Sequence, residues 1–98
     1  MNRVVIAQIS KEDAEKTYQI STWEPYDTEG PVIEKWLLVP PELGQEAVYI
    51  LEGNVTVRAL GCDYHLKPGH MIALDEGVEF FWIVDDFVKS VYKMSQDI

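Results

Sequence analysis

The sequence predicts an all-β domain, built as a sandwich or a barrel, with one short helix near its N-terminus. Its 98 residues allow a single domain, and a content of 47% hydrophobic and 26% charged residues is typical of a globular chain. Six glycines and five prolines divide residues 20–94 into short runs of strand length. No amphipathic segment is long enough for the crossover helices of a parallel sheet, which excludes a βαβ architecture.

The N-terminal segment, residues 1–19, is expected to hold one strand and one helix before the barrel at residues 20–94. Residues 3–9 contain enough β-branched side chains for a short strand. Ser10 can accept a hydrogen bond from the backbone N–H of Asp13, which is the pattern of a helix N-cap. We expect the helix to end by Tyr18 and, because one or two turns are marginal alone, to pack against a larger element.

Seven further runs have the length of strands. They span residues 32–39, 46–52, 54–60, 63–67, 71–74, 78–84 and 87–94. In 54–60 apolar residues alternate with polar ones, so one face of that strand is expected to be buried and the other wet. Residues 47–51 and 78–84 are apolar on both faces and need cover on both sides. The second cover has to come from the N-terminal segment or from another subunit, and we therefore expect a homodimer.

The charge balance excludes several classes of partner. Acidic residues number 17 and basic residues 8, so the net charge is −9, and a surface this negative repels nucleic acid and anionic membranes. No apolar run is long enough to span a membrane. The apolar stretch at residues 4–7 is too short for a signal peptide, and the single cysteine excludes an intrachain disulfide framework. We expect a cytoplasmic protein.

Residues 46–82 carry the pattern that identifies the barrel. Glu46 begins the segment Glu-Ala-Val-Tyr-Ile-Leu-Glu-Gly, which ends at Gly53, and a Pro-Gly step at Gly69 is followed by Gly77. These glycines lie where the chain has to reverse between strands, because positive φ is cheap for glycine. The block resembles the two motifs of the cupin superfamily, in particular small single-domain cupins related to ureidoglycine aminohydrolase and to ethanolamine-utilisation cupins. The resemblance covers roughly residues 20–94 and implies a double-stranded β-helix, a jelly-roll-like barrel.

The resemblance also implies where a metal would be bound. Metal-binding cupins usually supply two histidines and a Glu or Gln from the first motif and a third histidine from the second. Of these ligands the chain retains only Glu46. The first-motif histidine positions fall within residues 39–42, which read Val-Pro-Pro-Glu, and the second-motif position falls on Phe80, whose ring cannot ligate a metal. One carboxylate does not hold a transition metal, so we expect no metal at this position and no cofactor.

The remaining metal-ligating and nucleophilic side chains are few. His65 and His70 lie on opposite sides of a Pro-Gly turn, and we expect a solvated strand histidine and a turn histidine. A surface metal site that uses both is the alternative. Cys62 is expected in a tight hairpin turn beside the acidic Asp63, a setting that disfavours nucleophilic catalysis.

Three acidic runs are expected to be solvated turn or helix-start residues. They are Glu12-Asp13 with Glu15, Asp75-Glu76, and Asp85-Asp86.

The barrel interior is the remaining place for function. Strand parity places Phe80 with Trp82 on one face, and Trp36 with Glu34 on one face of another strand. If Glu46 points inward, as the motif implies, apolar neighbours desolvate its carboxylate and raise its pKa. Glu46 is then a candidate general acid or base. It is alternatively the polar anchor of a ligand pocket that also includes Glu34, Trp36, Phe80 and Trp82. The alternative is an idle carboxylate at the barrel mouth, with aromatic side chains that only pack.

Three functions remain open from the sequence. The first is a metal-free cupin that binds a small organic molecule inside the barrel. The second is a small-metabolite enzyme of the hydrolase, isomerase or lyase type, working through Glu46 and Glu34 without the usual metal. The third is a dimeric structural or regulatory protein that acts through its apolar strand faces.

Overall fold

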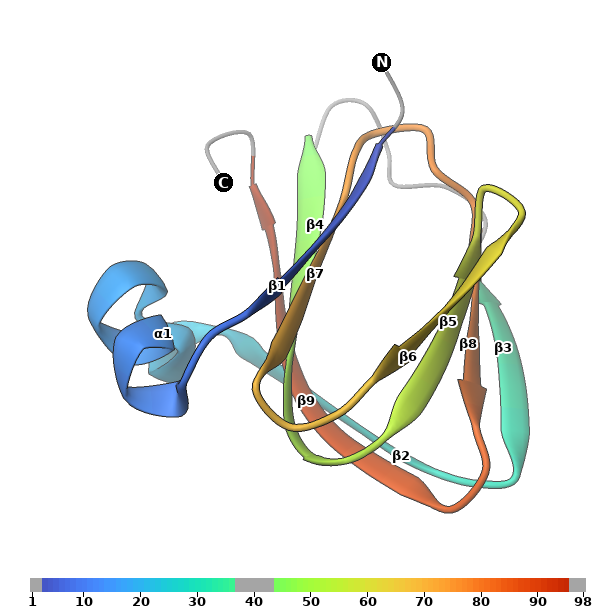
Figure 1. The fold of residues 1–98 in the computed structure, drawn as a ribbon, viewed down its shortest axis with the longest axis horizontal. Helices are drawn as coiled ribbons and strands as arrows, with labels where there is room; N and C mark the ends of the chain where they lie inside the picture. Colours follow the sequence, from blue (N-terminus) through green and yellow to red (C-terminus); the bar gives the residue numbers. More distant parts are fainter. Residues whose placement is uncertain (1–2, 37–43, 96–98) are drawn as a thin grey trace.

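The computed structural model describes residues 3–36 and 44–95, and it shows two antiparallel β-sheets that face each other (Figure 1). In the five-stranded sheet the order is β1 (Val4–Gln8), β7 (His70–Leu74), β4 (Gln45–Gly53), β9 (Phe87–Ser95) and β2 (Glu24–Glu29). In the four-stranded sheet the order is β3 (Val32–Trp36), β8 (Phe80–Val84), β5 (Val55–Ala59) and β6 (Cys62–Leu66). The all-β prediction is confirmed.

The main hydrophobic core lies between the two sheets. Its buried members include Val48 and Ile50 from β4, Val57 from β5, and Leu74 from β7. In β5 the buried residues Val55, Val57 and Ala59 alternate with more exposed ones, as predicted for a strand with one wet face. Alternation along facing strands therefore directs one side chain in two into the barrel.

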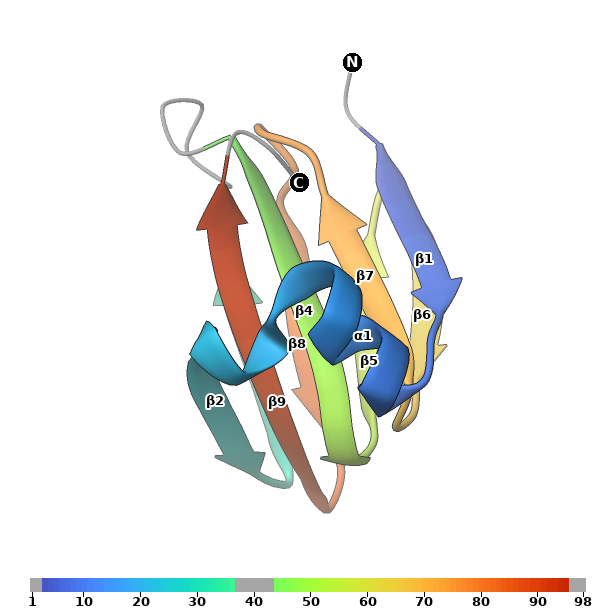
Figure 2. The same ribbon diagram turned by 90° about the vertical axis from the view of Figure 1, so that its left-hand side faces the viewer.

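A second core covers the outer face of the five-stranded sheet. The helix α1 (Lys11–Tyr18) and the 3₁₀ helix η1 (Ile20–Thr22) lie across this face (Figure 2). Ala14 and Trp23 pack there against Ala47 and Tyr49, which are the outward residues of β4. The N-terminal segment thus supplies the second cover that residues 47–51 require, and no second subunit is needed there.

The corresponding outer face of β8 has less cover. Phe81 and Ile83 point outward and are half-buried, and their neighbour Ile33 on β3 is 67% exposed. The apolar character of residues 78–84 on this side therefore remains without a covering layer among the described residues.

The predicted N-terminal cap is confirmed. Ser10 accepts a hydrogen bond from the backbone N–H of Asp13 at 3.1 Å, and α1 ends at Tyr18. The reversal at Gly53 is confirmed as well, with a φ of 75°. A Cβ at this position would also collide with the backbone carbonyl of Phe87, so glycine is required for both reasons.

Two features of the structure differ from the sequence expectations. The strand β2 was not predicted, because its residues are mostly polar, include Pro25 and show no clear alternation of apolar and polar side chains. The turn between β5 and β6 is formed by Leu60 and Gly61, both with positive φ, while Cys62 is already the first residue of β6. The expected strand at 32–39 is observed over Val32–Trp36, and its remaining residues lie outside the described ranges.

Among residues 3–36 and 44–95, no helix is both long and apolar enough to cross a membrane.

Candidate functional site

A pocket lies between the two sheets at one end of the barrel. At this end β3 and β9 finish and β4 and β8 begin, which is the upper end in Figure 1. The strand register brings Glu46 opposite Met94 and Trp36 opposite Phe80. The pocket is partly open to solvent and has a volume of about 50 Å³. The described residues that line it are Tyr26, Trp36, Glu46, Val48, Phe80, Trp82, Ser90, Tyr92 and Met94.

Glu46 is the acidic side chain among these lining residues. Its residue is only 7% exposed, and it lies on the inward face of β4 beside Val48. Burial raises the pKa of its carboxyl group from the ordinary 4.5 to about 7. Within the described residues, no hydrogen bond or neighbouring charge contributes to this change. The carboxyl group is therefore desolvated without a partner among the described residues, and it is partly protonated near neutral pH.

Aromatic rings form most of the pocket wall. The rings of Trp36 and Phe80 are nearly parallel, with 10° between their planes and 6.2 Å between their centroids. Tyr26 contacts Trp36, Trp82 and Tyr92 in edge-to-face geometry, with centroid distances from 5.5 to 6.3 Å. Such pairs stabilise one another beyond their buried area, so the wall is held in place before any ligand arrives.

Three other polar groups of the pocket are already bonded within the protein. The Tyr26 hydroxyl donates to Glu34 Oε1 at 2.6 Å, and desolvation together with this carboxylate raises the tyrosine pKa to about 12. The indole N–H of Trp82 donates to Thr28 Oγ1 at 3.1 Å, and the Ser90 hydroxyl donates to the Tyr26 carbonyl at 2.6 Å. These bonds leave Glu46 as a polar group available to a ligand.

The structure brings four of the five predicted site residues together. Glu46, Trp36, Phe80 and Trp82 line the same pocket. Glu34 does not line it and lies behind the Tyr26 hydroxyl, whose hydrogen bond it accepts. It is therefore placed to hold the tyrosine and not to contact a ligand directly.

Five other residues line the pocket: Val48 shares the strand parity of Glu46, and sequence reasoning missed the remaining four. Tyr26 belongs to the unpredicted strand β2, whereas Ser90, Tyr92 and Met94 occupy alternate positions of β9. The same parity argument, applied to residues 87–94, would have found the last three.

The chain is similar to known proteins of one family in sequence and in fold. Residues 35–92, more than half of the chain, match the family model of the EutQ-like cupin domain. The chain belongs to the EutQ-like cupin family. This cupin has the fold of a DUF861 family protein from Thermotoga maritima, with a TM-score of 0.77 and 24% identity over 94% of this chain and 99% of the other. It also resembles the Clostridium difficile EutQ protein, with a TM-score of 0.60 and 16% identity over 99% of this chain and 71% of that one. No curated protein matches it.

The described side chains around Glu46 do not fit a transition-metal centre. Phe80 stands at the position where the cupin resemblance implies a histidine ligand, and its ring packs against Trp36 inside the pocket. Within residues 3–36 and 44–95, no three His, Cys, Asp or Glu side chains gather closely enough to hold a metal ion. The first-motif ligand positions, at residues 39–42, lie outside the described residues. A single desolvated carboxyl group surrounded by rings is a poor donor set for a metal cation.

The two histidines of this cupin lie in different sheets. His65 belongs to β6 and its Nδ1 is 2.9 Å from Thr56 Oγ1, while His70 opens β7 and its Nδ1 accepts the Lys67 backbone N–H at 2.8 Å. Each ring therefore has a local structural partner. Cys62 is exposed and free.

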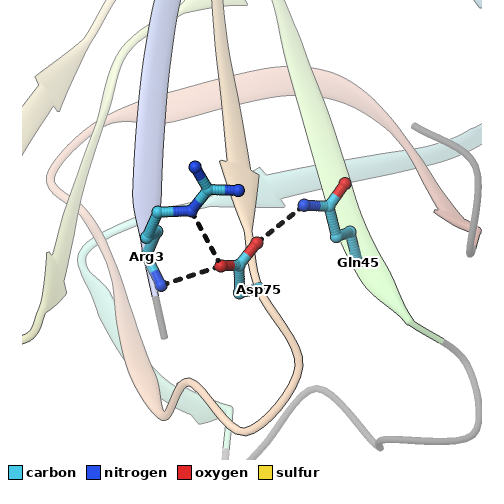
Figure 3. A network of polar contacts seen from close by, with 3 residues as sticks. All are labelled: Arg3, Gln45 and Asp75. Atoms are coloured by element: carbon cyan, nitrogen blue, oxygen red, sulfur yellow. Dashed lines mark hydrogen bonds and ion pairs between the residues drawn. The ribbon is translucent and has the colours of Figure 1, made fainter. Parts of the chain in front are cut away.

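The expectation that Asp75 is a solvated turn residue is wrong. Asp75 is buried and joins three strands of the five-stranded sheet (Figure 3). It accepts hydrogen bonds from the Arg3 backbone N–H at 3.0 Å, from Arg3 Nε at 3.2 Å and from Gln45 Nε2 at 2.6 Å. The bond from Gln45 contributes most to lowering its carboxyl pKa. Its neighbour Glu76, and Asp85 and Asp86, are exposed as expected.

Proposed function

We propose that this cupin binds a small organic molecule in the barrel pocket, with Glu46 as the polar anchor and without a catalytic metal. The observation that carries the proposal is the buried carboxyl group of Glu46. Burial desolvates this group inside a wall of aromatic side chains, and burial is the cause of its raised pKa. A desolvated polar group is unfavourable unless a partner compensates it, and a ligand would supply that partner.

The shape of the pocket supports a small ligand. About 50 Å³ of space accommodates a compact group or a few water molecules, not a large cofactor. The lining includes Trp36 and Trp82, so an occupant would change the environment of two indole rings.

The test is tryptophan fluorescence and two-dimensional NMR of the ¹⁵N-labelled protein with a panel of small amines, acids, alcohols and amides. Binding is expected to shift the indole signals of Trp36 and Trp82. Trp23, which packs under α1 outside the barrel, serves as an internal control that stays unchanged. If no compound of the panel moves the pocket indoles, the proposal is wrong.

Glu46 also favours a second candidate function, an enzyme that uses general acid–base catalysis. A carboxyl pKa of about 7 lets one group both accept and donate a proton near neutral pH. The two candidates separate once a binding compound is known. A time course by NMR would show turnover that Glu46→Gln abolishes if the protein is an enzyme, and an unchanged compound if it only binds.

We also propose a cytoplasmic location. The exposed and free thiol of Cys62 supports a reducing compartment. Fractionation of the source cells would test this directly.

A further inference from the structure

The pocket combines one acidic group with several π systems. Glu46 lies in the same cavity as Tyr26, Trp36, Phe80 and Trp82, and Tyr92 completes the wall. The face of an aromatic ring carries partial negative charge and attracts ammonium groups. A carboxylate attracts the same class of group directly, and it does so more strongly where water is excluded.

We propose that the pocket selects small organic cations, in particular a methylated ammonium group, which would contact the aromatic wall and pair with the Glu46 carboxylate. This inference rests on the proposed function, because it names the chemical class of the ligand in the same pocket.

Other ligand classes fit the pocket less well. An anion would be repelled by the Glu46 carboxylate and by a chain whose net charge is −9. A neutral apolar compound would fill the space between the rings but would leave the buried carboxyl group without a partner. A bare metal ion would find one carboxyl group among the described lining residues, and no group of three acidic, histidine or cysteine side chains lies close enough within the described ranges to hold it.

A neutral hydrogen-bond donor is the strongest competitor. An alcohol could donate to Glu46 and contact the rings, but it would gain neither the charge–charge attraction nor the interaction of a cation with the aromatic faces. The small cavity volume limits the occupant to a compact head group and disfavours a large molecule.

The pH dependence of ligand binding provides a second test of the same site. The pocket also contains the hydroxyl groups of Tyr26 and Tyr92, and Glu34 lies behind the former. From β7, the neutral side chain of Leu74 lies opposite Glu46, and the nearby Asp75 carboxylate is bonded to Arg3 and Gln45. None of these charged groups contributes to the pKa of Glu46. Binding of a permanent cation should therefore follow the ionisation of Glu46 and strengthen as the pH rises from about 6 to about 8.

The experiment titrates the ¹⁵N-labelled protein with tetramethylammonium chloride at constant ionic strength. tert-Butanol, a neutral compound of similar shape, and sodium acetate serve as comparison ligands. Tetramethylammonium is expected to shift the Trp36 and Trp82 indole signals but not that of Trp23, and to bind at least about tenfold more tightly than tert-butanol.

Two variants separate charge from shape. Glu46→Gln keeps the size of the side chain and should lower tetramethylammonium affinity by about tenfold or more. Glu52→Gln removes an exposed carboxylate from the same strand and should leave affinity unchanged. If Glu46→Gln does not fold, the pH titration of the unmodified protein supplies the same comparison.

Each outcome has a distinct meaning. Equal affinity for tert-butanol, tighter binding of acetate, or affinity that does not change with pH would overturn the cation inference while the pocket still binds ligands. If neither these three probes nor the wider panel moves the Trp36 and Trp82 signals, the proposed function fails together with the inference.

Discussion

Trp36 and Phe80 lie opposite each other in the antiparallel pairing of β3 with β8, and their rings stack nearly parallel with 6.2 Å between their centroids. Phe80 is almost fully buried by this arrangement, at the position where the cupin resemblance implies a histidine. At the position where the cupin resemblance implies a metal ligand, the pair therefore forms part of an aromatic wall around Glu46.

The first prediction concerns metal content. We expect the purified protein to contain no stoichiometric Mn, Fe, Ni or Zn, because one carboxyl group and aromatic rings do not provide the nitrogen and oxygen ligands those ions need. Elemental analysis of the dialysed protein measures this. A stoichiometric metal would contradict the prediction, and its loss in Glu46→Gln but not in Glu52→Gln would place that metal in the pocket.

The second prediction concerns the dependence of stability on pH. Folding raises the pKa of Glu46 from 4.5 to about 7, so the folded chain favours the protonated carboxyl group. The resulting contribution to stability is fully present below about pH 4.5 and is lost as the pH rises through about 7. Glu46→Gln removes this dependence, and its stability relative to the unmodified protein should rise by roughly 2–3 kcal/mol between pH 5 and pH 8.

Urea denaturation of both proteins at the two pH values measures the effect. Glu52→Gln is the matched control, because Glu52 is exposed on the same strand and its variant should show little change. A Glu46→Gln variant that is destabilised equally at pH 5 and pH 8 would show that the carboxyl group is not desolvated as described.

The sequence predicted the parts of this fold that depend on local chemistry. The N-cap at Ser10, the reversal at Gly53 and the alternation in β5 each follow from a short segment, and each is confirmed. The cupin motif then placed Glu46, and parity placed Phe80, on strands whose inward faces share one pocket. Motif and parity therefore indicated the candidate site before the pairing of the strands was known.

The features that were missed depend on long-range contacts. The edge strand β2 is polar over most of its length, and it is a strand because it pairs with β9, whose partner residues lie 58–68 positions further along the sequence. Asp75 looks like an ordinary turn residue until the sheet brings Arg3 and Gln45 to it. Local pattern cannot report partners of this kind, and so Tyr26 and the buried role of Asp75 were not foreseen.

The third prediction concerns the attachment of β1. Because Asp75 accepts bonds from Arg3 and Gln45, Asp75→Ala should lower the free energy of unfolding by about 1–3 kcal/mol at neutral pH and increase hydrogen exchange in β1. The Asp75 pKa is lowered in the folded chain, so the stabilisation is present above its ordinary value of 3.8 and is lost as the pH falls through the lowered value. Glu76→Ala, at the exposed neighbour, is the control. Equal effects of both variants would refute the structural role of the network.

The fourth prediction is a homodimer through the outer face of the four-stranded sheet. Ile33 is 67% exposed, and it lies beside the half-buried Ile83 and Phe81. Ion pairs on this sheet, Lys35 with Glu79 at 2.9 Å and Arg58 with Asp63 at 2.7 Å, bring both signs of charge to the vicinity of the apolar residues.

We propose a second copy of the chain as the occupant of this face, because a two-fold arrangement sets the apolar residues against their own counterparts and lets opposite charges meet. Light scattering coupled to size exclusion should give the mass of a dimer for the unmodified protein and of a monomer for Ile33→Glu. Val5→Glu, an equally drastic change at an exposed position of β1, should remain dimeric. A monomeric unmodified protein would refute the dimer. Dissociation by Val5→Glu, with Ile33→Glu still dimeric, would place the interface on the other sheet and leave the apolar side of β8 exposed.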